Sequence, residues 1–386
     1  MPEIRDVAIF IINYNGVTLL KDLFYKCLDS FVVGVPRSSN FVDLWFIDNG
    51  STDSSLEEAK ARYQGKIRYL RLSRNLGYGA ACNIAYKYTK RLGLQYKYYV
   101  CSNNDIEVYP GKLKELLRWL NTIEKRYPKG FIVAPLLING YDGFIDFGGF
   151  LVDEAGGTWP LRLVLLNRDR VDTILKKPIP VSYSDGAFLI IHRRVIEDVG
   201  WFDPYLFLYY EDVELSLRAW SHGYPSLLVP VVLGVHYRNL TTKKMGIVPV
   251  YLHVRNRTYS VTHYMGIASL LKLILWYLSY TIRILEAKNI QLRELAKKIM
   301  PGRMIYEFNN VSLLRLSRHI VRALIEGFTI ALKRRKKRFR RLVDKNTLLR
   351  INLTDMFSQK KIITKIQSQV KQYIMHALSS EDWRDW

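Results

Sequence analysis

Two adjacent acidic residues, Glu211 and Asp212, are the first candidates for chemistry in this chain of 386 residues. They follow an apolar and aromatic run at 207–210 and begin a segment whose apolar residues have helical spacing. Apolar neighbours can raise the pKa of a carboxyl group towards the range that suits a general base. Acidic residues at the start of a helix also stabilise it by complementing its dipole, without any catalytic role. The pair alone leaves both interpretations open.

Four apolar segments upstream of this pair, at 7–12, 44–47, 67–72 and 98–101, alternate with stretches of helical spacing. Apolar runs bounded by turn residues are typical of strands buried on both faces of a parallel sheet. Ser54 and Glu57 have the spacing of a capping box at the start of one helix. The alternation predicts an α/β sandwich with a mainly parallel sheet.

Each predicted strand ends in a polar loop, and the loops carry Tyr14, Asp48, Arg74 and Asp105. Any one of these loops could be a simple helix-capping turn. In open α/β sheets, however, ligands bind beyond the carboxyl ends of the strands. We therefore expect the four loops to meet in one crevice.

Six motifs in this order resemble those of family 2 glycosyltransferases, and the rhamnosyltransferase-type branch in particular. They are NYNG, DNGSTD, RNLGYGAACN, NND, DGAFL and FLYYEDVELSLRA, within residues 7–238. The resemblance implies a GT-A nucleotide-diphosphosugar transferase fold and an inverting transfer to a hydroxyl group. It implies that Tyr14 stacks on the nucleobase, Asp48 accepts a hydrogen bond from the base, and Arg74 meets a diphosphate or base edge. The donor-binding set that it implies is Tyr14, Asn15, Asp48, Arg74, Asn75, Gly77, Gly79, Asn83, Asn104 and Asp105.

The resemblance also assigns a metal, a base and an acceptor site. Asn103-Asn104-Asp105 stands where the family has its metal-binding DxD, so only Asp105 brings a full charge to Mg²⁺ or Mn²⁺. His236 falls where related enzymes have a further metal ligand, although a lone His beside an apolar strand is often structural. Asp212 takes the role of general base in a single displacement. The acceptor-binding candidates are Asp185, Gly186, Glu211 and Trp201, of which the Trp could equally be a core residue.

Positive charge is concentrated at the C-terminal end of the chain. Residues 241–386 hold 29 Lys and Arg against 9 Asp and Glu, which places 20 of the 23 net positive charges there. We expect a catalytic domain at 1–240 and a basic, helical, membrane-associating region at 241–386. Apolar segments at 267–285 and 312–332 carry charges at helical spacing, and eight of the nine residues at 333–341 are basic. This pattern favours interfacial helices on an anionic membrane over a membrane-spanning helix, while a nucleic-acid partner explains the charge but not the helices.

The combined expectation is a metal-assisted glycosyltransferase at the cytoplasmic face of the cell membrane, peripheral or monotopic, with a second copy of the chain as a candidate partner in a homo-oligomer. Its donor would be a nucleotide-diphosphosugar, and its acceptor a lipid-linked sugar or a polysaccharide. Three scattered cysteines without CxxC spacing favour a reducing compartment. Two alternatives remain: a nucleic-acid- or lipid-binding protein with a non-catalytic domain of this fold, or a sugar nucleotidyltransferase.

Overall fold

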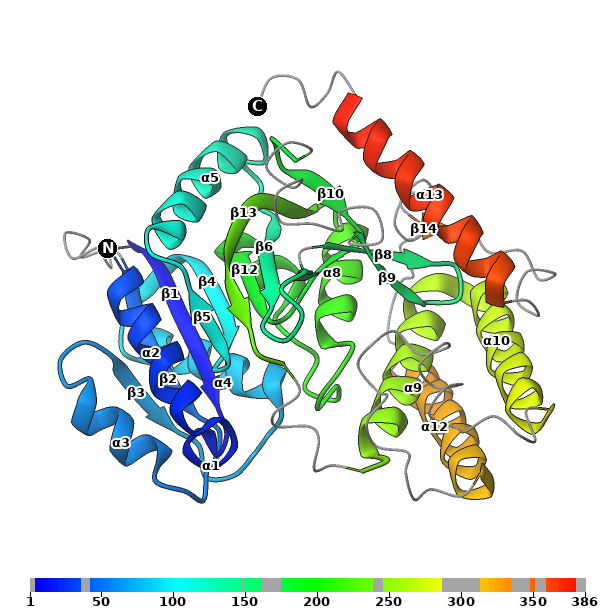
Figure 1. The fold of residues 1–386 in the computed structure, drawn as a ribbon, viewed down its shortest axis with the longest axis horizontal. Helices are drawn as coiled ribbons and strands as arrows, with labels where there is room; N and C mark the ends of the chain where they lie inside the picture. Colours follow the sequence, from blue (N-terminus) through cyan, green and yellow to red (C-terminus); the bar gives the residue numbers. More distant parts are fainter. Residues whose placement is uncertain are drawn as a thin grey trace.

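The computed structural model describes residues 4–35, 42–147, 149–161, 175–238, 246–286, 313–334, 348–350 and 359–379. Its central sheet has the strand order β10-β13-β6-β12-β4-β1-β2-β3, with β5 paired to β13 and β7 to β6. The four predicted strands are β1 (Ile4–Asn13), β2 (Val42–Asp48), β3 (Arg68–Arg71) and β4 (Gln95–Asn103), and they pair in parallel. The prediction of an α/β fold with this parallel unit is confirmed (Figure 1).

The other half of the sheet mixes strand directions. It contains β5 (Ile106–Val108), β6 (Ile132–Asn139), β7 (Ile145–Phe147), β10 (Ile179–Val181), β12 (Phe188–His192) and β13 (Ser226–His236). β12 is antiparallel to both β4 and β6, whereas β13 is parallel to β6. The carboxyl ends of β1, β2, β4 and β13 therefore lie at one edge, where their terminal residues can meet.

Helices cover both faces of the sheet because the side chains of a strand alternate between its two faces. On one face, Val7, Ile9 and Ile11 of β1 share a core cluster with α2 (Asp22–Gly34), α3 (Ser55–Arg62) and α5 (Lys112–Arg126). On the other face, Ala8 and Phe10 share a cluster with α4 (Tyr78–Arg91) and α7 (Arg193–Val199). α8 (Glu211–Ser221) contributes buried residues to both clusters, which fixes the helix that begins with the acidic pair.

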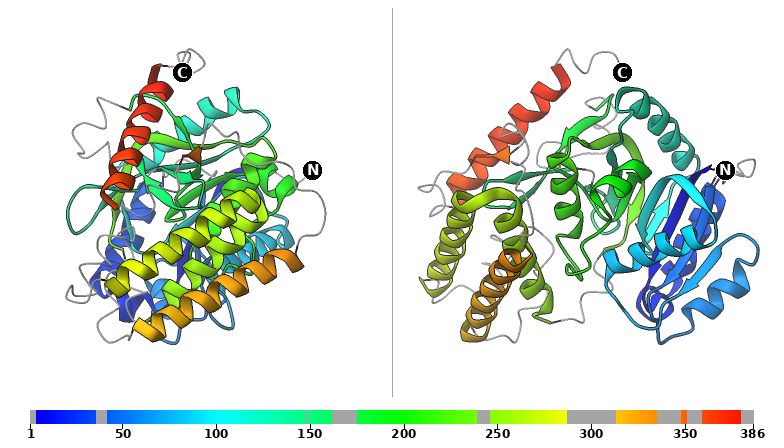
Figure 2. Two further views of the ribbon diagram at one scale, coloured as in Figure 1. Left: turned by 90° about the vertical axis from the view of Figure 1, so that its right-hand side faces the viewer. Right: turned by 180° about the vertical axis from the view of Figure 1, so that it is seen from behind.

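A second, smaller sheet lies between the central sheet and the C-terminal helices. It contains β8 (Gly149–Asp153), β9 (Thr158–Pro160), β11 (Tyr183–Ser184) and β14 (Leu348–Leu349). A third core cluster combines residues of β6 and β13 with α9 (Val248–Ser260), α10 (Gly266–Glu286), α12 (Leu313–Lys333) and α13 (Gln359–Ser379). The two views of Figure 2 show α9, α10 and α12 gathered at one end of the molecule.

One helical run, Val248–Ser279, is long and apolar enough to cross a membrane by length and composition alone. A π-helical turn at Val261–Met265 interrupts this run, and Gly266 follows with a φ of 78°. The chain bends there between α9 and α10, so the run is not one straight helix (Figure 1). The side chain of Arg283 and most of the basic segment 333–341 lie outside the described residues.

The predicted capping box at Ser54 and Glu57 is wrong. Ser54 makes no side-chain cap hydrogen bond, and its hydroxyl instead donates to Glu58. Asp53 Oδ1 accepts the backbone N–H of Ser55, while its Oδ2 accepts that of Thr18. A carboxylate one residue earlier therefore satisfies the helix start and also holds the β1 loop beside it.

Candidate active site

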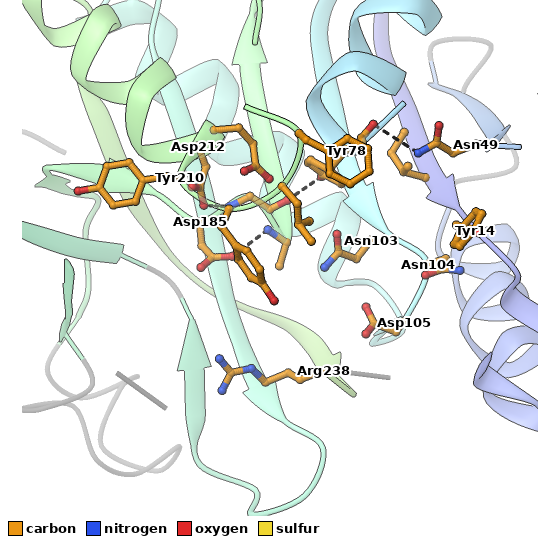
Figure 3. Close-up of a pocket in the computed structure, with 18 of the residues that line it drawn as sticks. Tyr14, Asn49, Tyr78, Asn103, Asn104, Asp105, Asp185, Tyr210, Asp212 and Arg238 are labelled. Carbon is orange, nitrogen blue, oxygen red and sulfur yellow. Dashed lines mark hydrogen bonds between the residues drawn. The ribbon is translucent and has the colours of Figure 1, made fainter. Parts of the chain in front are cut away.

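A cavity of about 390 Å³ opens at the edge where the carboxyl ends of the strands meet. Residues from all six motifs line it, together with the end of β13 (Figure 3). The lining includes Ile12, Tyr14, Asn49, Asn75, Gly77, Tyr78, Asn103, Asn104, Asp105, Asp185, Gly186, Glu211, Asp212, His236 and Arg238. The fold thus brings acidic, basic, amide and aromatic groups from separate parts of the chain into one place.

Asp212 is held at the N-terminus of α8 by two backbone N–H groups. Its Oδ2 accepts a hydrogen bond from Gly186 at 2.8 Å, and its Oδ1 accepts one from Val213 at 2.8 Å. A Cβ atom at Gly186 would stand only 3.2 Å from Oδ2, so this glycine allows the close approach. The carboxylate is 7% exposed and lines the cavity, which gives a buried, oriented acceptor of protons.

The Gly186 turn is itself fixed from the opposite side. Tyr78 Oη donates a 2.6 Å hydrogen bond to the carbonyl of Gly186, and Asp185 Oδ1 accepts the N–H of Ala187. Burial raises the pKa of Tyr78 well above 10, so its phenol remains a neutral donor across the physiological range. Asp212 and its nearest backbone partner are therefore held rigidly from two elements.

Asp105 and His236 form the second polar group of the cavity. His236 Nε2 lies 3.1 Å from Asp105 Oδ1, and the Asn103 amide nitrogen lies 3.3 Å from the same ring nitrogen. They meet because β13 pairs with β5, which places His236 opposite Ile106. Among the described residues, no three His, Cys, Asp or Glu side chains come together as a complete metal site. The pair offers two donors of the types that divalent ions accept, so any ion would need further oxygens from a ligand.

The arginine that lines the cavity is not the one that the sequence suggested. Arg74 is exposed and lies outside the cavity lining, with its backbone packed against Gly50. Arg238 lies two residues beyond His236, is 9% exposed and lines the cavity (Figure 3). Its φ of 40° turns the chain at this point. A buried guanidinium in the lining of this cavity is suited to the oxygens of a diphosphate.

The amide side chains near β1 and β2 build the wall around Tyr14. Asn49 donates to Asn75 Oδ1 and accepts the N–H of Leu76, and Asn104 donates to Asn13 Oδ1 at 2.7 Å. Asp48 is fully buried at the end of β2 and does not line the cavity, although its neighbour Asn49 does. Neither of its oxygens accepts a hydrogen bond within the described structure, and Oδ2 lies 3.7 Å from Arg71 Nε. A buried carboxylate in this condition is suited to an N–H donor of a ligand.

Several predicted site residues support the cavity without lining it. Asn15 Oδ1 accepts the N–H of Thr52, and Asn83 donates to the carbonyl of Phe202 from the helix behind. A Cβ atom at Gly79 would stand 2.7 Å from Phe202 Cβ. Trp201 is in the core, stacked on Tyr86 at 5.2 Å between ring centroids, so it does not face a sugar in the cavity.

Tyr209 and Tyr210 enter α8 through a strained backbone. Their φ values are 66° and 71°, a region that bulky residues rarely adopt. The Asn256 amide nitrogen of α9 donates to the carbonyls of Leu208 and Tyr209 at 3.0 and 2.7 Å. The loop also approaches Gly77 so closely that a Cβ atom there would stand 2.1 Å from the Phe207 carbonyl oxygen. Packing and hydrogen bonds hold this turn, which aims Asp212 into the cavity.

Sequence reasoning missed Asn49, Tyr78, Arg238 and Asn256. Asn49 and Tyr78 lie inside motifs that were recognised for their neighbours, so the motifs themselves carried the signal. Arg238 also stood beside a candidate ligand, His236. Asn256 lies in the segment 251–257, which resembles one that closes active sites of this kind, but its contacts with 208–209 depend on how α9 packs.

Comparisons with known proteins agree with this architecture. The family model described as glycosyl transferase family 2 matches residues 8–200, half of the chain. N-acetylglucosaminyl-diphospho-decaprenol L-rhamnosyltransferase of Mycobacterium tuberculosis is 28% identical over 219 residues, covering 52% of this chain and 68% of that protein. The low-salt glycan biosynthesis hexosyltransferase Agl10 of Haloferax volcanii is 25% identical over 257 residues, covering 65% and 74%.

A solved structure shows the same fold. The crystal structure of GalNAc-T7 with UDP, GalNAc and Mn²⁺ superposes with a TM-score of 0.53 at 15% sequence identity. The match covers 87% of this chain but only 57% of that one, so this chain spans little more than half of its length. Together with the family match, this likeness confirms the predicted GT-A fold.

Proposed function

Because this chain belongs to glycosyl transferase family 2, we propose that it moves a sugar from a nucleotide-diphosphosugar to a hydroxyl of a lipid-linked acceptor. The chain is similar to a rhamnosyltransferase whose name specifies a diphospho-decaprenol-linked sugar, and to a glycan hexosyltransferase. The observation that carries the proposal is the single cavity in which Asp212 faces the Asp105, His236 and Arg238 group.

Asp212 is the general base in this proposal. The acceptor oxygen attacks the anomeric carbon of the sugar while the bond from that carbon to the diphosphate oxygen breaks on the opposite side. The hydroxyl proton passes to a carboxylate oxygen of Asp212, and the nucleoside diphosphate leaves with the bonding electrons. The N–H groups of Gly186 and Val213 orient the carboxylate, so the base is in place before the acceptor arrives.

The donor is bound by the β1–β4 side of the cavity. Tyr14 supplies an aromatic face for the nucleobase, and Asp48, buried next to the lining residue Asn49, accepts its ring N–H. Arg238, which follows β13 at the other side of the cavity, binds the diphosphate. Asp105 and His236 would hold Mg²⁺ or Mn²⁺ together with diphosphate oxygens, and such an ion offsets the charge of the leaving group. Asp185 and Glu211 lie beside Asp212 in the lining and are suited to acceptor hydroxyls.

An Asp212→Asn variant tests the proposal against a purely binding function. We expect the transfer rate to fall by about a thousandfold or more, because a positioned base contributes two to four orders of magnitude and the amide cannot take the proton. Thermal stabilisation by a nucleotide-diphosphosugar with Mg²⁺ or Mn²⁺ should be retained, since the donor contacts are on the other side of the cavity. Transfer at the wild-type rate would contradict the role of Asp212. A chain that binds no nucleotide-diphosphosugar would favour the non-catalytic alternative.

A further inference from the structure

Two helices of the C-terminal region expose continuous apolar stripes. On α10 the stripe is Ile267, Leu271, Ile274 and Leu278, and on α12 it is Val321, Ile325, Phe328 and Leu332. Each stripe has the spacing i, i+4, i+7, i+11, which places its members on one face of a helix. These eight side chains are between 36% and 70% exposed. Contiguous exposed apolar surface of this kind marks an interaction site rather than ordinary surface.

The stripes are not the faces with which these helices join the core. α10 buries Leu270, Leu273 and Tyr277, and α12 buries Leu316, Ile320 and Ala323. Both helices thus have an inner apolar face against α9 and a separate outer one. Figure 2 (left) shows α10 and α12 running along the same side of the molecule.

Charge distinguishes among possible partners for this face. Arg315, Arg318, Arg322 and Lys333 are exposed beside the α12 stripe. The acid within this helix, Glu326, contacts Arg255 and the hydroxyls of Tyr205 and Tyr251 on the inner side. An apolar stripe bordered by arginines matches an anionic bilayer, in which side chains enter the acyl boundary and cations meet the headgroups.

The outer helix α13 provides an internal comparison. It packs its own apolar face inward through Ile366, Val370 and Ile374, but its outward side chains include Gln367, Ser368, Lys371 and Gln372. Among the side chains described in this helix, Met375, 60% exposed, is the one large apolar side chain that is exposed. Among the described residues, a continuous stripe of exposed apolar side chains is therefore found on α10 and α12, whereas α9 and α13 expose one large apolar side chain each, Val248 and Met375.

We propose that the outer faces of α10 and α12 together form a docking surface for an anionic lipid bilayer, with the helices lying along the interface. This inference deepens the proposed function, on which it rests for the lipid-linked acceptor, by naming the surface through which the enzyme meets its substrate. A lipid-anchored acceptor is at high effective concentration for an enzyme held on the same bilayer. The bend at Gly266 and the inward packing of α9 favour interfacial docking over a spanning helix.

Vesicle co-sedimentation of the full chain without donor or acceptor tests the surface. We expect binding to phosphatidylcholine vesicles that contain phosphatidylglycerol, weaker binding to phosphatidylcholine alone, and a decrease with salt. A Leu271→Glu/Ile325→Glu variant should bind more than about tenfold more weakly, because two apolar side chains no longer enter the bilayer. An Arg315→Gln/Arg318→Gln variant should lose mainly the preference for phosphatidylglycerol. The matched control, Met375→Glu, should bind as the wild type does.

Other results would overturn the proposal. They are wild-type protein that stays in the supernatant at low salt, or a Leu271→Glu/Ile325→Glu variant that sediments normally. A shift of that variant from dimer to monomer in size-exclusion chromatography, with unchanged vesicle binding, would identify the face as a contact between two copies. Thermal stabilisation by a nucleotide-diphosphosugar, measured on the same variants, reports the donor site separately. If a variant loses vesicle binding but is still stabilised by the donor, the substitution has affected the docking surface and not the donor site.

Discussion

Asp105 and His236 lie in contact although they are more than 130 residues apart in the chain, and Arg238 lines the same cavity. The β13–β5 pairing sets His236 against Ile106, and Tyr237 donates its N–H to the carbonyl of Asp105. Backbone hydrogen bonds thus set the relative position of Asp105 and His236, the two candidate metal ligands. Arg238 follows directly and brings the guanidinium to the same wall.

A pair of matched substitutions decides which arginine binds the donor diphosphate. We expect Arg238→Gln to weaken binding of a nucleoside diphosphate by about 10- to 100-fold, because a hydrogen bond to a charged group contributes about 1.5–3 kcal/mol. Arg74→Gln should change it by less than about twofold, since an exposed charge outside the cavity is screened by solvent. Isothermal titration calorimetry on both variants gives the comparison. If Arg74→Gln weakened nucleoside diphosphate binding more than Arg238→Gln does, Arg74 would be the residue that binds the diphosphate.

At the scale of the elements, α9 acts as a brace for the turn that precedes α8. Arg255 donates to Asn256 Oδ1 and to the carbonyl of Tyr205, and its guanidinium stacks on the Tyr205 ring at 4.4 Å. Asn256 then donates to the two carbonyls at 208–209. Residues in sparsely populated φ/ψ regions cost about 1–3 kcal/mol each, so the turn depends on such support.

Removing this brace should impair chemistry more than donor binding. We expect Asn256→Ala to lower kcat by about 10- to 100-fold, because a base displaced by about 1 Å loses its alignment with the acceptor. The donor Kd should remain within about twofold, since the β1–β4 wall is untouched. Thr258→Val is a matched control in α9, where the Thr258 hydroxyl donates to Val254 O within the helix. Equal losses of kcat in both variants would indicate a general effect on α9 rather than on the turn.

The parts that the sequence predicted are those encoded locally. Strands β1, β2 and β4 are apolar runs because they are buried on both faces, and polar residues at their ends mark the edge of the cavity. The roles of Arg238 and Asn256 were not predicted, because they depend on contacts with segments that are distant in the sequence. The same holds for α12: the sequence distinguishes apolar from charged positions, but only packing against α9 decides that Ile320 is buried and Ile325 exposed.

At the scale of the whole molecule, α12 connects the proposed membrane face to the turn that precedes α8. Arg334 binds both carboxylate oxygens of Asp203, and Tyr259 of α9 donates to the same carboxylate. Burial alone would raise the pKa of Asp203, but the hydrogen bonds from Arg334 and its other donors outweigh this and lower it. The ion pair is therefore charged at neutral pH and is lost as the pH falls through that lowered pKa. Contacts of α12 thus reach residue 203, at the start of the loop that ends in Asp212.

Gly327 allows a test of the packing between α12 and α9 at a position far from the cavity. A Cβ atom there would stand 2.3 Å from the Arg255 carbonyl oxygen and 2.9 Å from Thr258 Cβ, so α12 crosses α9 in close contact. We expect Gly327→Ala to force the helices apart, lower the free energy of unfolding by about 1–3 kcal/mol, and slow transfer to a water-soluble acceptor. Thr329→Ala is the control, because its hydroxyl donates within α12 to Ile325 O. Denaturant unfolding and transfer rates are measured on both variants. If Gly327→Ala lowers the free energy of unfolding but transfers sugar at the wild-type rate, the packing of α12 against α9 does not control the turn that precedes α8.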